Sequence, residues 1–191
     1  MPRLTKDQTY QKLRRAVIDE AVAKGFAATG VAGVVKRAKV SAGTVYVHFA
    51  DKDDMLRSIY METKAAFHEA VTAPRDMTDT KAMIRAMWDA MFDFVREDPK
   101  SFLFLEYGST AGILTDDQKA ITDSYAREIA AMFQRGVDSG VLAKLDTHLL
   151  SLLLVAPALQ LARSAALNDQ PPTDEIVQLT FERVWLSIAN T

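Results

Sequence analysis

Cysteine is absent from the 191-residue sequence, and its absence excludes disulfides, thiol nucleophiles and cysteine metal sites. Motifs of enzyme chemistry are missing as well. His48, His68 and His148 lie far apart, no HExxH pair is present, and no GxSxG, Walker-type or GxGxxG segment occurs. The sequence therefore predicts no enzyme, no catalytic residue, no metal site and no cofactor. His68, which follows Phe67 and precedes Glu69 on a predicted helix, is expected to face solvent.

Long apolar runs are scarce. The most apolar stretch, residues 149–162, is shorter than the roughly 20 residues that a membrane helix needs, and Pro157 interrupts it. We therefore interpret it as a buried helix rather than a membrane span. The first residues, MPRLTKDQTYQKLRRAV, are charged and lack the apolar core of a secretory signal. Together with the missing cysteine, this favours a cytoplasmic protein without a membrane partner.

The alternation typical of strands, internal repeats and low-complexity tracts are also missing, whereas helix signals are frequent. Thr5 with Gln8 and Thr115 with Gln118 have the spacing of capping boxes. These signals predict an all-α fold of about nine helices, with a linker at residues 74–78. The longer ones are expected at about 5–24, 52–71, 80–97, 115–140, 146–167 and 173–189.

Charge is divided unevenly along the chain. Residues 1–50 hold nine Lys and Arg against three Asp and Glu, a balance of +6; residues 51–191 hold fourteen against twenty-two, a balance of −8. A basic module suits neutralisation of DNA phosphates, while an acidic remainder is repelled by DNA. On charge alone, a merely solvated basic face is the alternative.

The stretch SAGTVYVHFADK, residues 41–52, follows a predicted short helix at 31–38 and a tight turn. Val45 and Phe49 are four residues apart and share one face of a second short helix, while Tyr46 and His48 lie on the other. Two short helices joined by such a turn form a helix-turn-helix, whose second helix lies in the DNA major groove.

The residues from Gly25 to Leu56 carry the pattern GF..T.V......A.VS.GT.Y.HF..K..ML. This pattern resembles the DNA-binding signature of TetR/AcrR-type bacterial transcriptional regulators. The resemblance covers the first third of the chain, and the remainder is similar in length and helical character only. Two positions depart from it: Ala32 and Gly33 stand where the family often has Arg followed by an acidic residue. Gly30, the expected N-cap, has no side-chain oxygen to cap that helix.

By this resemblance and by side-chain chemistry, the phosphate contacts are expected at Thr44, Tyr46, His48 and Lys52. Base edges would face Ala42, Gly43 and Val47, none of which can form a side-chain hydrogen bond. Selectivity must then use the Gly43 backbone, DNA shape, or the remaining polar candidates: Ser41, Lys36, Lys39, Arg3 and Lys6. A packing role is the alternative for Tyr46. Phe26 is expected in the core of the three-helix module, beside Val34, Val45 and Phe49.

The resemblance also implies a ligand pocket in the C-terminal part. Its candidate lining residues combine aromatic rings and methionines with one carboxylate: Met87, Trp88, Met91, Phe92, Phe104, Glu106 and Tyr107. An ordinary packed core is the alternative for the apolar members. Glu106 stands in the apolar segment FLFLEYG, so it must be exposed, paired with an arginine or aimed at a cationic ligand.

The last two predicted helices carry more apolar side chains than one small domain can cover, which favours a homodimer through a four-helix interface. The expected interface residues are Leu149, Leu150, Leu153, Leu154, Leu161, Val177, Phe181, Val184 and Trp185. The division is then a DNA-binding domain at 1–50 and an effector-binding and dimerisation domain at 51–191, connected by the helix at 52–71.

The predicted function is a ligand-responsive transcriptional regulator, most simply a repressor, that binds a palindromic operator on double-stranded DNA as a homodimer. A small lipophilic effector would release it. The alternative is a helical ligand-binding or adaptor protein without specific DNA binding.

Overall fold

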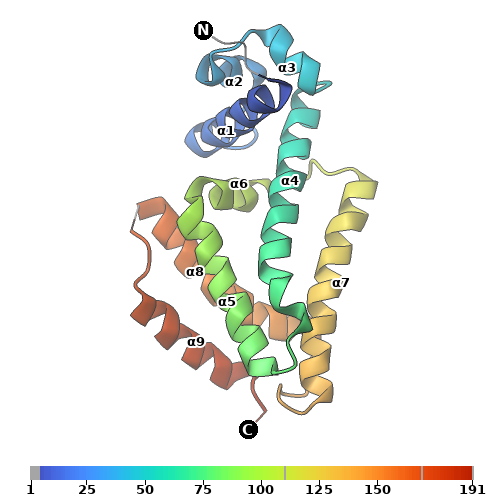
Figure 1. Ribbon diagram of the computed structural model, residues 1–191, viewed down its shortest axis with the longest axis vertical. Helices are drawn as coiled ribbons and strands as arrows, with labels where there is room; N and C mark the ends of the chain where they lie inside the picture. The colour runs from blue at the N-terminus through green and yellow to red at the C-terminus, as the bar shows by residue number, and fades with distance from the viewer. Residues whose placement is uncertain (1–4, 110, 169, 191) are drawn as a thin grey trace. The chain divides into compact units, whose positions relative to one another are not determined.

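The computed structural model describes residues 5–109, 111–168 and 170–190. This part of the chain contains nine α-helices and one 3-10 helix, and its only strand-like pairing is an isolated bridge between Leu142 and Ala189. The elements, shown in Figure 1, are α1 (Lys6–Lys24), α2 (Val31–Ala38), α3 (Ala42–His48), α4 (Lys52–Thr72), η1 (Ala73–Asp76), α5 (Thr80–Glu97), α6 (Pro99–Ser109), α7 (Asp116–Asp138), α8 (Thr147–Asn168) and α9 (Asp174–Ile188). The predicted all-α class is confirmed.

Local capping explains where the helices begin. Thr5 and Thr115 both form complete capping boxes with the Gln three residues later, as predicted. Gly25 ends α1 with a positive φ of 91°, a conformation that side chains with a Cβ rarely adopt. The predicted linker at 74–78 is wrong in its first part, because η1 continues the helical path from α4 through Asp76.

The chain forms two compact units. Unit 1 comprises Met1–Lys64 and Lys100–Leu114, and unit 2 comprises Ala65–Pro99 and Thr115–Thr191. α4 therefore contributes to both units, and α6 belongs with the N-terminal helices. The assignment of DNA binding to residues 1–50 and effector binding to 51–191 stays a prediction.

The core of unit 1 includes α6. The buried Phe26 ring lies 5.2 Å from the Phe104 ring of α6, a partner that the sequence did not indicate. The Nζ atom of Lys100, near the start of α6, lies 2.6 Å from Asp19 Oδ1 of α1. An apolar contact and an ion pair thus attach α6 to the N-terminal helices.

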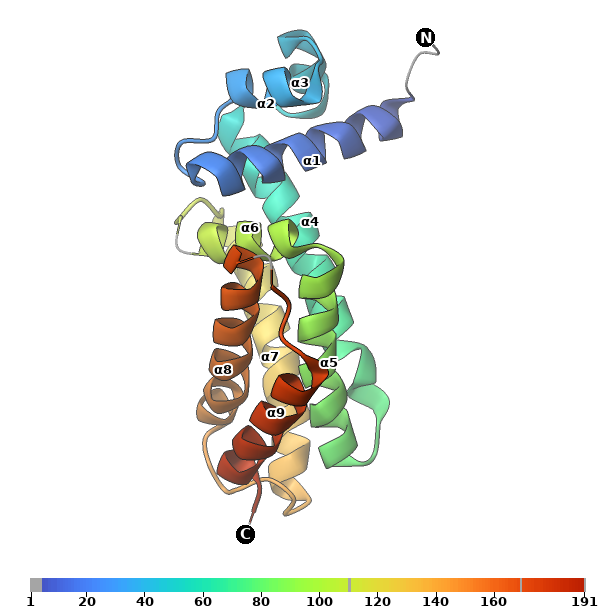
Figure 2. The ribbon, with the colours of Figure 1, turned by 90° about the vertical axis from the view of Figure 1, so that its left-hand side faces the viewer.

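In unit 2, α8 contacts α5, α7 and α9, and Figure 2 shows α9 crossing beside α5 and α8. The core contains large side chains from each of these helices: Trp88, Phe92, Phe133, Leu150, Leu154, Val177 and Phe181.

The interpretation of α8 needs correction. Pro157 lies inside the helix, in agreement with the predicted bounds of 146–167, but α8 spans 22 residues and so has the length and composition of a membrane-crossing helix. A core helix passes the same test. α8 is buried along only one face, formed by Leu150, Leu154, Ala158, Ala162 and Ala165. Leu149 and Leu152, on other faces, are 43% and 49% exposed.

Candidate nucleic-acid interface

The connection between α2 and α3 has the geometry of a helix-turn-helix. Lys39 ends α2 in the left-handed region at φ 50°, which turns the chain sharply. Ser41 then caps α3, since its Oγ accepts a hydrogen bond from Thr44 N at 3.2 Å. The Ser41 and Thr44 hydroxyls also lie 2.9 Å apart. As predicted, Gly30 gives α2 no side-chain cap, so packing of Val34 and Ala38 must hold that helix.

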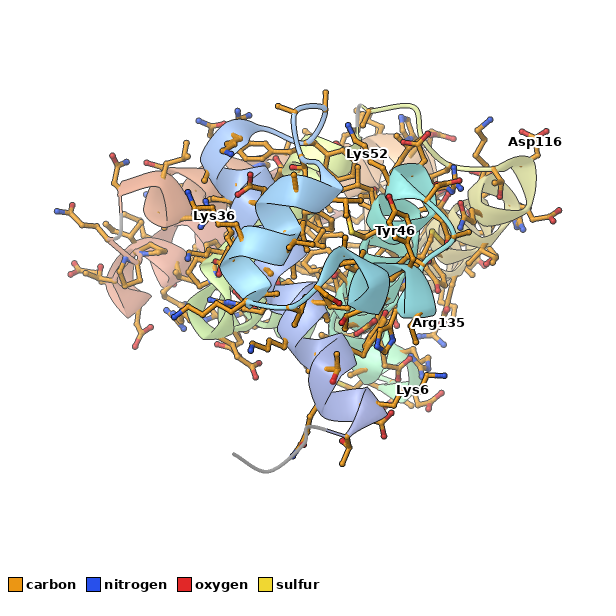
Figure 3. All side chains as sticks on the ribbon, turned by 90° about the horizontal axis from the view of Figure 1, so that it is seen from above. Lys6, Lys36, Tyr46, Lys52, Asp116 and Arg135 are labelled. Atoms are coloured by element: carbon orange, nitrogen blue, oxygen red, sulfur yellow. The ribbon has the colours of Figure 1, made fainter. Side chains whose placement is uncertain are left out.

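α3 presents two different faces. Val45 is 1% exposed and packs inward, whereas Tyr46 is 57% and Val47 70% exposed. The phenol and the isopropyl group are therefore available for contact with a partner. Ser41, Ala42 and Gly43 are exposed as well, and Thr44 and His48 are half-buried. All the predicted α3 contacts are therefore at least partly accessible, and these residues, 41–44 and 46–48, are here called the α3 face. Figure 3 looks toward this surface and labels Tyr46 with Lys36 and Lys52.

Gly43 leaves open space on this face. A Cβ added there would meet nothing nearer than Ser41 Oγ at 3.8 Å. The backbone at Gly43 is thus accessible to a base edge or a phosphate without interference from a side chain. Ala42 and Val47, its exposed neighbours, offer only apolar contact of the kind that a thymine methyl can accept.

Lys52 starts α4, where the helix dipole disfavours a cation. Its Nζ donates to the Ala27 carbonyl oxygen at 2.8 Å, and Asp53 and Asp54 supply negative charge in the same turn. Asp51 caps the start of the helix, since Asp54 N donates to Asp51 Oδ1 at 2.7 Å. The positive charge of Lys52 at the helix N-terminus is therefore compensated without a phosphate. The Ala27 carbonyl accepts from only one of the three N–H groups of the Lys52 ammonium, so the others can donate to DNA.

Comparison with known proteins assigns the family. The family model for bacterial regulatory proteins of the tetR family matches residues 15–59, and that for the tetracyclin repressor-like C-terminal domain matches residues 80–189. The chain belongs to the TetR family. Members of this family are DNA-binding transcription regulators, not enzymes.

Individual relatives of this TetR-family chain are distant in sequence. An uncharacterised HTH-type transcriptional regulator of Haemophilus influenzae is 28% identical over 81% of this chain and 82% of its own length. The HTH-type transcriptional activator FasR of Mycolicibacterium smegmatis is 27% identical over 96% of this chain and 84% of its own. The crystal structure of a TetR-family regulator from Marinobacter aquaeolei VT8 covers 97% of both chains with a TM-score of 0.85 at 23% identity, which shows the shared fold.

Tyr10, which the sequence did not single out, supports the α3 face of this TetR-family chain. Its ring centroid lies 5.8 Å from that of His48 and 5.8 Å from that of Phe49. Its hydroxyl donates to Glu62 Oε2 at 2.7 Å. Burial, and then this hydrogen bond to a carboxylate, raise the pKa of Tyr10 to about 12. The phenol thus stays neutral, and its ring packs against the His48 ring.

A buried carboxylate explains the glycine at position 33. Glu20 of α1 is 3% exposed and forms ion pairs with Lys24, at 2.7 Å, and with Arg37 of α2. Hydrogen bonds from Lys24 and then from Arg37 lower the pKa of Glu20. A Cβ at Gly33 would lie 2.0 Å from Glu20 Oε1, so the glycine makes room for this carboxylate. The family often has an acidic residue at this position of α2, and here Glu20 of α1 supplies the carboxylate instead.

The basic residues of α1 and α2 near the helix-turn-helix divide by what they contact. Arg37 pairs with Glu20, whereas Lys6, Lys36 and Lys39 are exposed at the surface. Arg3 lies outside the described residues. Lys36 lies in the last turn of α2 and Lys39 ends that helix, so both precede α3 in the helix-turn-helix.

The predicted effector residues fall into both units. Met87, Trp88, Met91 and Phe92 are at most 2% exposed on α5 in unit 2, whereas Phe104, Glu106 and Tyr107 lie on α6 in unit 1. Trp88 Nε1 donates to the Val177 carbonyl at 3.2 Å, and its ring contacts Phe92 and Phe181. A cavity of about 170 Å³ reaches Phe92, and a cleft of about 640 Å³ lies between α5 and α9.

Glu106 has a neighbouring cation that the sequence did not indicate. Glu106 and Lys64 are both half-buried, and they interact electrostatically. Desolvation lowers the pKa of Lys64, and the nearby Glu106 opposes that shift. From the sequence we expected Glu106 to be exposed, paired with an arginine or directed at a cationic ligand. A lysine neighbour was not predicted.

The predicted exposure of His68 is wrong. His68 is 7% exposed and its ring stacks on Tyr125 of α7, with the centroids 4.1 Å apart. Its Nε2 atom lies 2.8 Å from Glu128 Oε2. Sequence spacing places His68 on α4 but cannot reveal that α7 covers it.

Proposed function

We propose that this TetR-family regulator binds a palindromic operator as a cytoplasmic homodimer, represses transcription and is released by a small lipophilic effector. The observation that carries the DNA-binding part is the α3 face. Tyr46 and Val47 are exposed beside the fully packed Val45, and the donors of Thr44, His48 and Lys52 occupy the same end of unit 1. These groups suit phosphate contacts and the approach of a backbone to base edges.

The dimer proposal uses the exposed apolar residues of α8 and α9. Of the nine interface residues predicted from the sequence, Leu150, Leu154, Val177, Phe181 and Val184 are buried within the chain itself and cannot form the interface. Other leucines and an isoleucine of these two helices are 43–60% exposed: Leu149, Leu152, Leu167, Ile176, Leu179 and Leu186. Apolar surface of this extent on two neighbouring helices favours association with a second copy.

Repression is supported by the similarity of residues 80–189 to the tetracyclin repressor-like C-terminal domain. The M. smegmatis relative, FasR, is named an activator, so transcription must be measured directly. Transcription in vitro from a promoter that carries the selected operator should decrease when the protein is added. An increase would reverse this part of the proposal.

The effector proposal rests on the aromatic and methionine side chains of α5. Polarizable side chains of this kind adapt to lipophilic ligands. Because Lys64 lies near Glu106, that carboxylate does not by itself favour a cationic effector. To act as an inducer, the compound must bind the operator-incompetent state more tightly than the competent one.

Effector binding can be tested with the two tryptophans, Trp88 and Trp185. A Trp185→Phe protein leaves the buried Trp88 as the only fluorescent tryptophan. It is screened against tetraphenylphosphonium, dodecanoate and dodecanol, which are cationic, anionic and neutral. The compound that releases operator DNA should also quench the Trp88 fluorescence. Quenching without release, or release from a Trp88→Phe protein at unchanged concentration, would place the effector elsewhere.

The central experiment selects bound sequences from random DNA with the full chain. We expect inverted half-sites whose centres lie about 10 bp apart or a multiple of it, because two recognition helices meet successive major grooves. Analytical ultracentrifugation of the same sample should show a dimer at micromolar concentration. Recovery of a single half-site, or of no preferred sequence, would refute the palindromic operator.

A further inference from the structure

A polar cluster joins the end of α4 to α7 within unit 2. The His68 side chain is 8% exposed, its Nε2 lies 2.8 Å from Glu128 Oε2, and its ring lies almost parallel to Tyr125 at an interplanar angle of 13°. Because a carboxylate only accepts hydrogen bonds, Nε2 carries a proton and donates it. His68 is therefore fixed by one hydrogen bond and one stacking contact, both from α7.

The other imidazole nitrogen of His68, Nδ1, makes this arrangement less stable. Nδ1 is buried and has no hydrogen-bond partner in the described part of the chain. In the neutral ring with Nε2 protonated, Nδ1 is an acceptor, and burial without a donor is unfavourable. A half-satisfied polar contact is more easily opened than a fully satisfied one. The cluster thus suits a reversible contact better than a permanent core.

Glu128 extends the contact beyond α4. Its Oε1 lies 3.7 Å from Nη1 of Arg75 in η1, and the same guanidinium donates to the Thr72 carbonyl at 3.1 Å and to Glu69 at 2.9 Å. One α7 carboxylate thereby reaches both the last turns of α4 and the segment that follows. Removal of both acceptor oxygens of Glu128 should loosen that whole end.

We infer that His68, Tyr125 and Glu128 form a latch between α4 and α7 that sets operator affinity. This inference rests on the proposed operator binding. α4 is one continuous helix whose residues belong to unit 1 up to Lys64 and to unit 2 from Ala65 onward. The apparent operator affinity scales with the fraction of molecules in a competent conformation. The proposed repressor binds operator without effector, so the effector-free conformation is the competent one; contacts that hold the unit 2 end of α4 in this conformation raise that fraction.

The test compares variants that remove each contact with variants that keep it. Glu128→Leu removes the acceptor, whereas Glu128→Gln keeps a carbonyl oxygen that can accept from Nε2. Tyr125→Ala removes the stacked ring, whereas Tyr125→Phe keeps it. All four variants change one of two positions, Tyr125 or Glu128, which lie in unit 2 and leave the α3 face untouched. Circular dichroism and thermal melting identify any variant that fails to fold.

Operator affinity is measured by fluorescence anisotropy at one fixed salt concentration, with the sequence obtained by selection. We expect Glu128→Leu and Tyr125→Ala to bind operator at least about 5-fold more weakly, the lower end of usual coupling between sites. Glu128→Gln and Tyr125→Phe should stay within about 2-fold of the unchanged protein, as should binding of all variants to unrelated DNA. Equal operator affinity of Glu128→Leu and the unchanged protein, or an equal loss on unrelated DNA, would overturn the latch.

Hydrogen exchange provides a test that needs no variant. If the latch increases operator affinity, operator binding must stabilise the latch to the same extent. Binding of operator to the unchanged protein should therefore increase amide protection at residues 66–72 and 122–131. Unchanged protection there would also overturn the inference. Failure to select any operator would refute the proposed function, whereas a selected operator with unaffected latch variants would refute the latch alone.

Discussion

Gly108 lies in the last turns of α6, where an alanine would place a methyl group against two buried rings. A Cβ at this position would lie 2.5 Å from Cδ2 of Tyr60 and 2.9 Å from Cε2 of Phe26. Tyr60 is 4% and Phe26 5% exposed, so neither ring can turn freely into solvent. Gly108→Ala therefore tests whether close packing of α6 stabilises unit 1.

Two effects oppose each other in this substitution. Alanine gains about 1 kcal/mol over glycine in a helix interior, while overpacking a filled core costs about 1–3 kcal/mol. Because the contacts would be far inside van der Waals distance and involve rigid rings, we place the overpacking cost in the upper part of its range, about 2–3 kcal/mol, so the protein should lose about 1–2 kcal/mol net. With a urea m-value of about 2 kcal/mol/M, the unfolding midpoint should fall by roughly 0.5–1 M.

Gly43→Ala is the matched control, because a Cβ on α3 meets only Ser41 Oγ at 3.8 Å. It should raise stability by about 0.5–1 kcal/mol through helix propensity alone. Both proteins are compared by urea unfolding followed by circular dichroism. In a double-mutant cycle, Tyr60→Leu should recover part of the Gly108→Ala loss by making space. A Gly108→Ala protein as stable as the unchanged chain would refute the packing argument.

Three further predictions concern charge and association. Lys52→Ala should weaken binding to all DNA sequences alike and reduce the salt slope by about one, measured by anisotropy across salt concentrations; altered sequence preference at equal affinity would contradict a phosphate contact. Because the folded pKa of Glu20 is lowered, its stabilisation is present above the ordinary value of 4.5 and should disappear as pH falls through the folded value. Acid unfolding of Glu20→Gln should lack this component, and an identical pH profile would contradict the assignment. Leu179→Asp places a charge on a side chain that is 51% exposed on α9 and should yield monomers by sedimentation, whereas an intact dimer would remove Leu179 from the interface.

Helix boundaries could be predicted well because their signals are local. The side chains of Thr5 and Thr115 bond to backbone N–H groups three residues away, so the sequence alone contains both partners. The division of α3 into a packed and an exposed face was equally predictable, since spacing fixes which side chains share a face. Val45 is buried and Val47 exposed as expected.

Contacts between distant segments could not be predicted in this way. Nothing in the segment FLFLEYG indicates that Phe104 packs against Phe26, or that Lys64 lies near Glu106. The apolar residues of α8 illustrate the same limit. Leu149 and Leu150 are adjacent and chemically identical, yet one is 43% exposed and the other fully buried, because the packing of neighbouring helices decides which face is covered.

The covalent path between the two units constrains how an effector can act on DNA binding. The chain passes between unit 1 and unit 2 at three peptide bonds, Lys64–Ala65, Pro99–Lys100 and Leu114–Thr115. The first lies inside α4, where helical hydrogen bonds continue across it, so a change on one side is carried by a stiff element. The second lies within the first turn of α6, whose remaining residues are attached to unit 1 through Phe104 and Lys100. His68 is one helical turn beyond the first of these bonds, which makes its contact with α7 a suitable point for a ligand in unit 2 to alter the path to the α3 face.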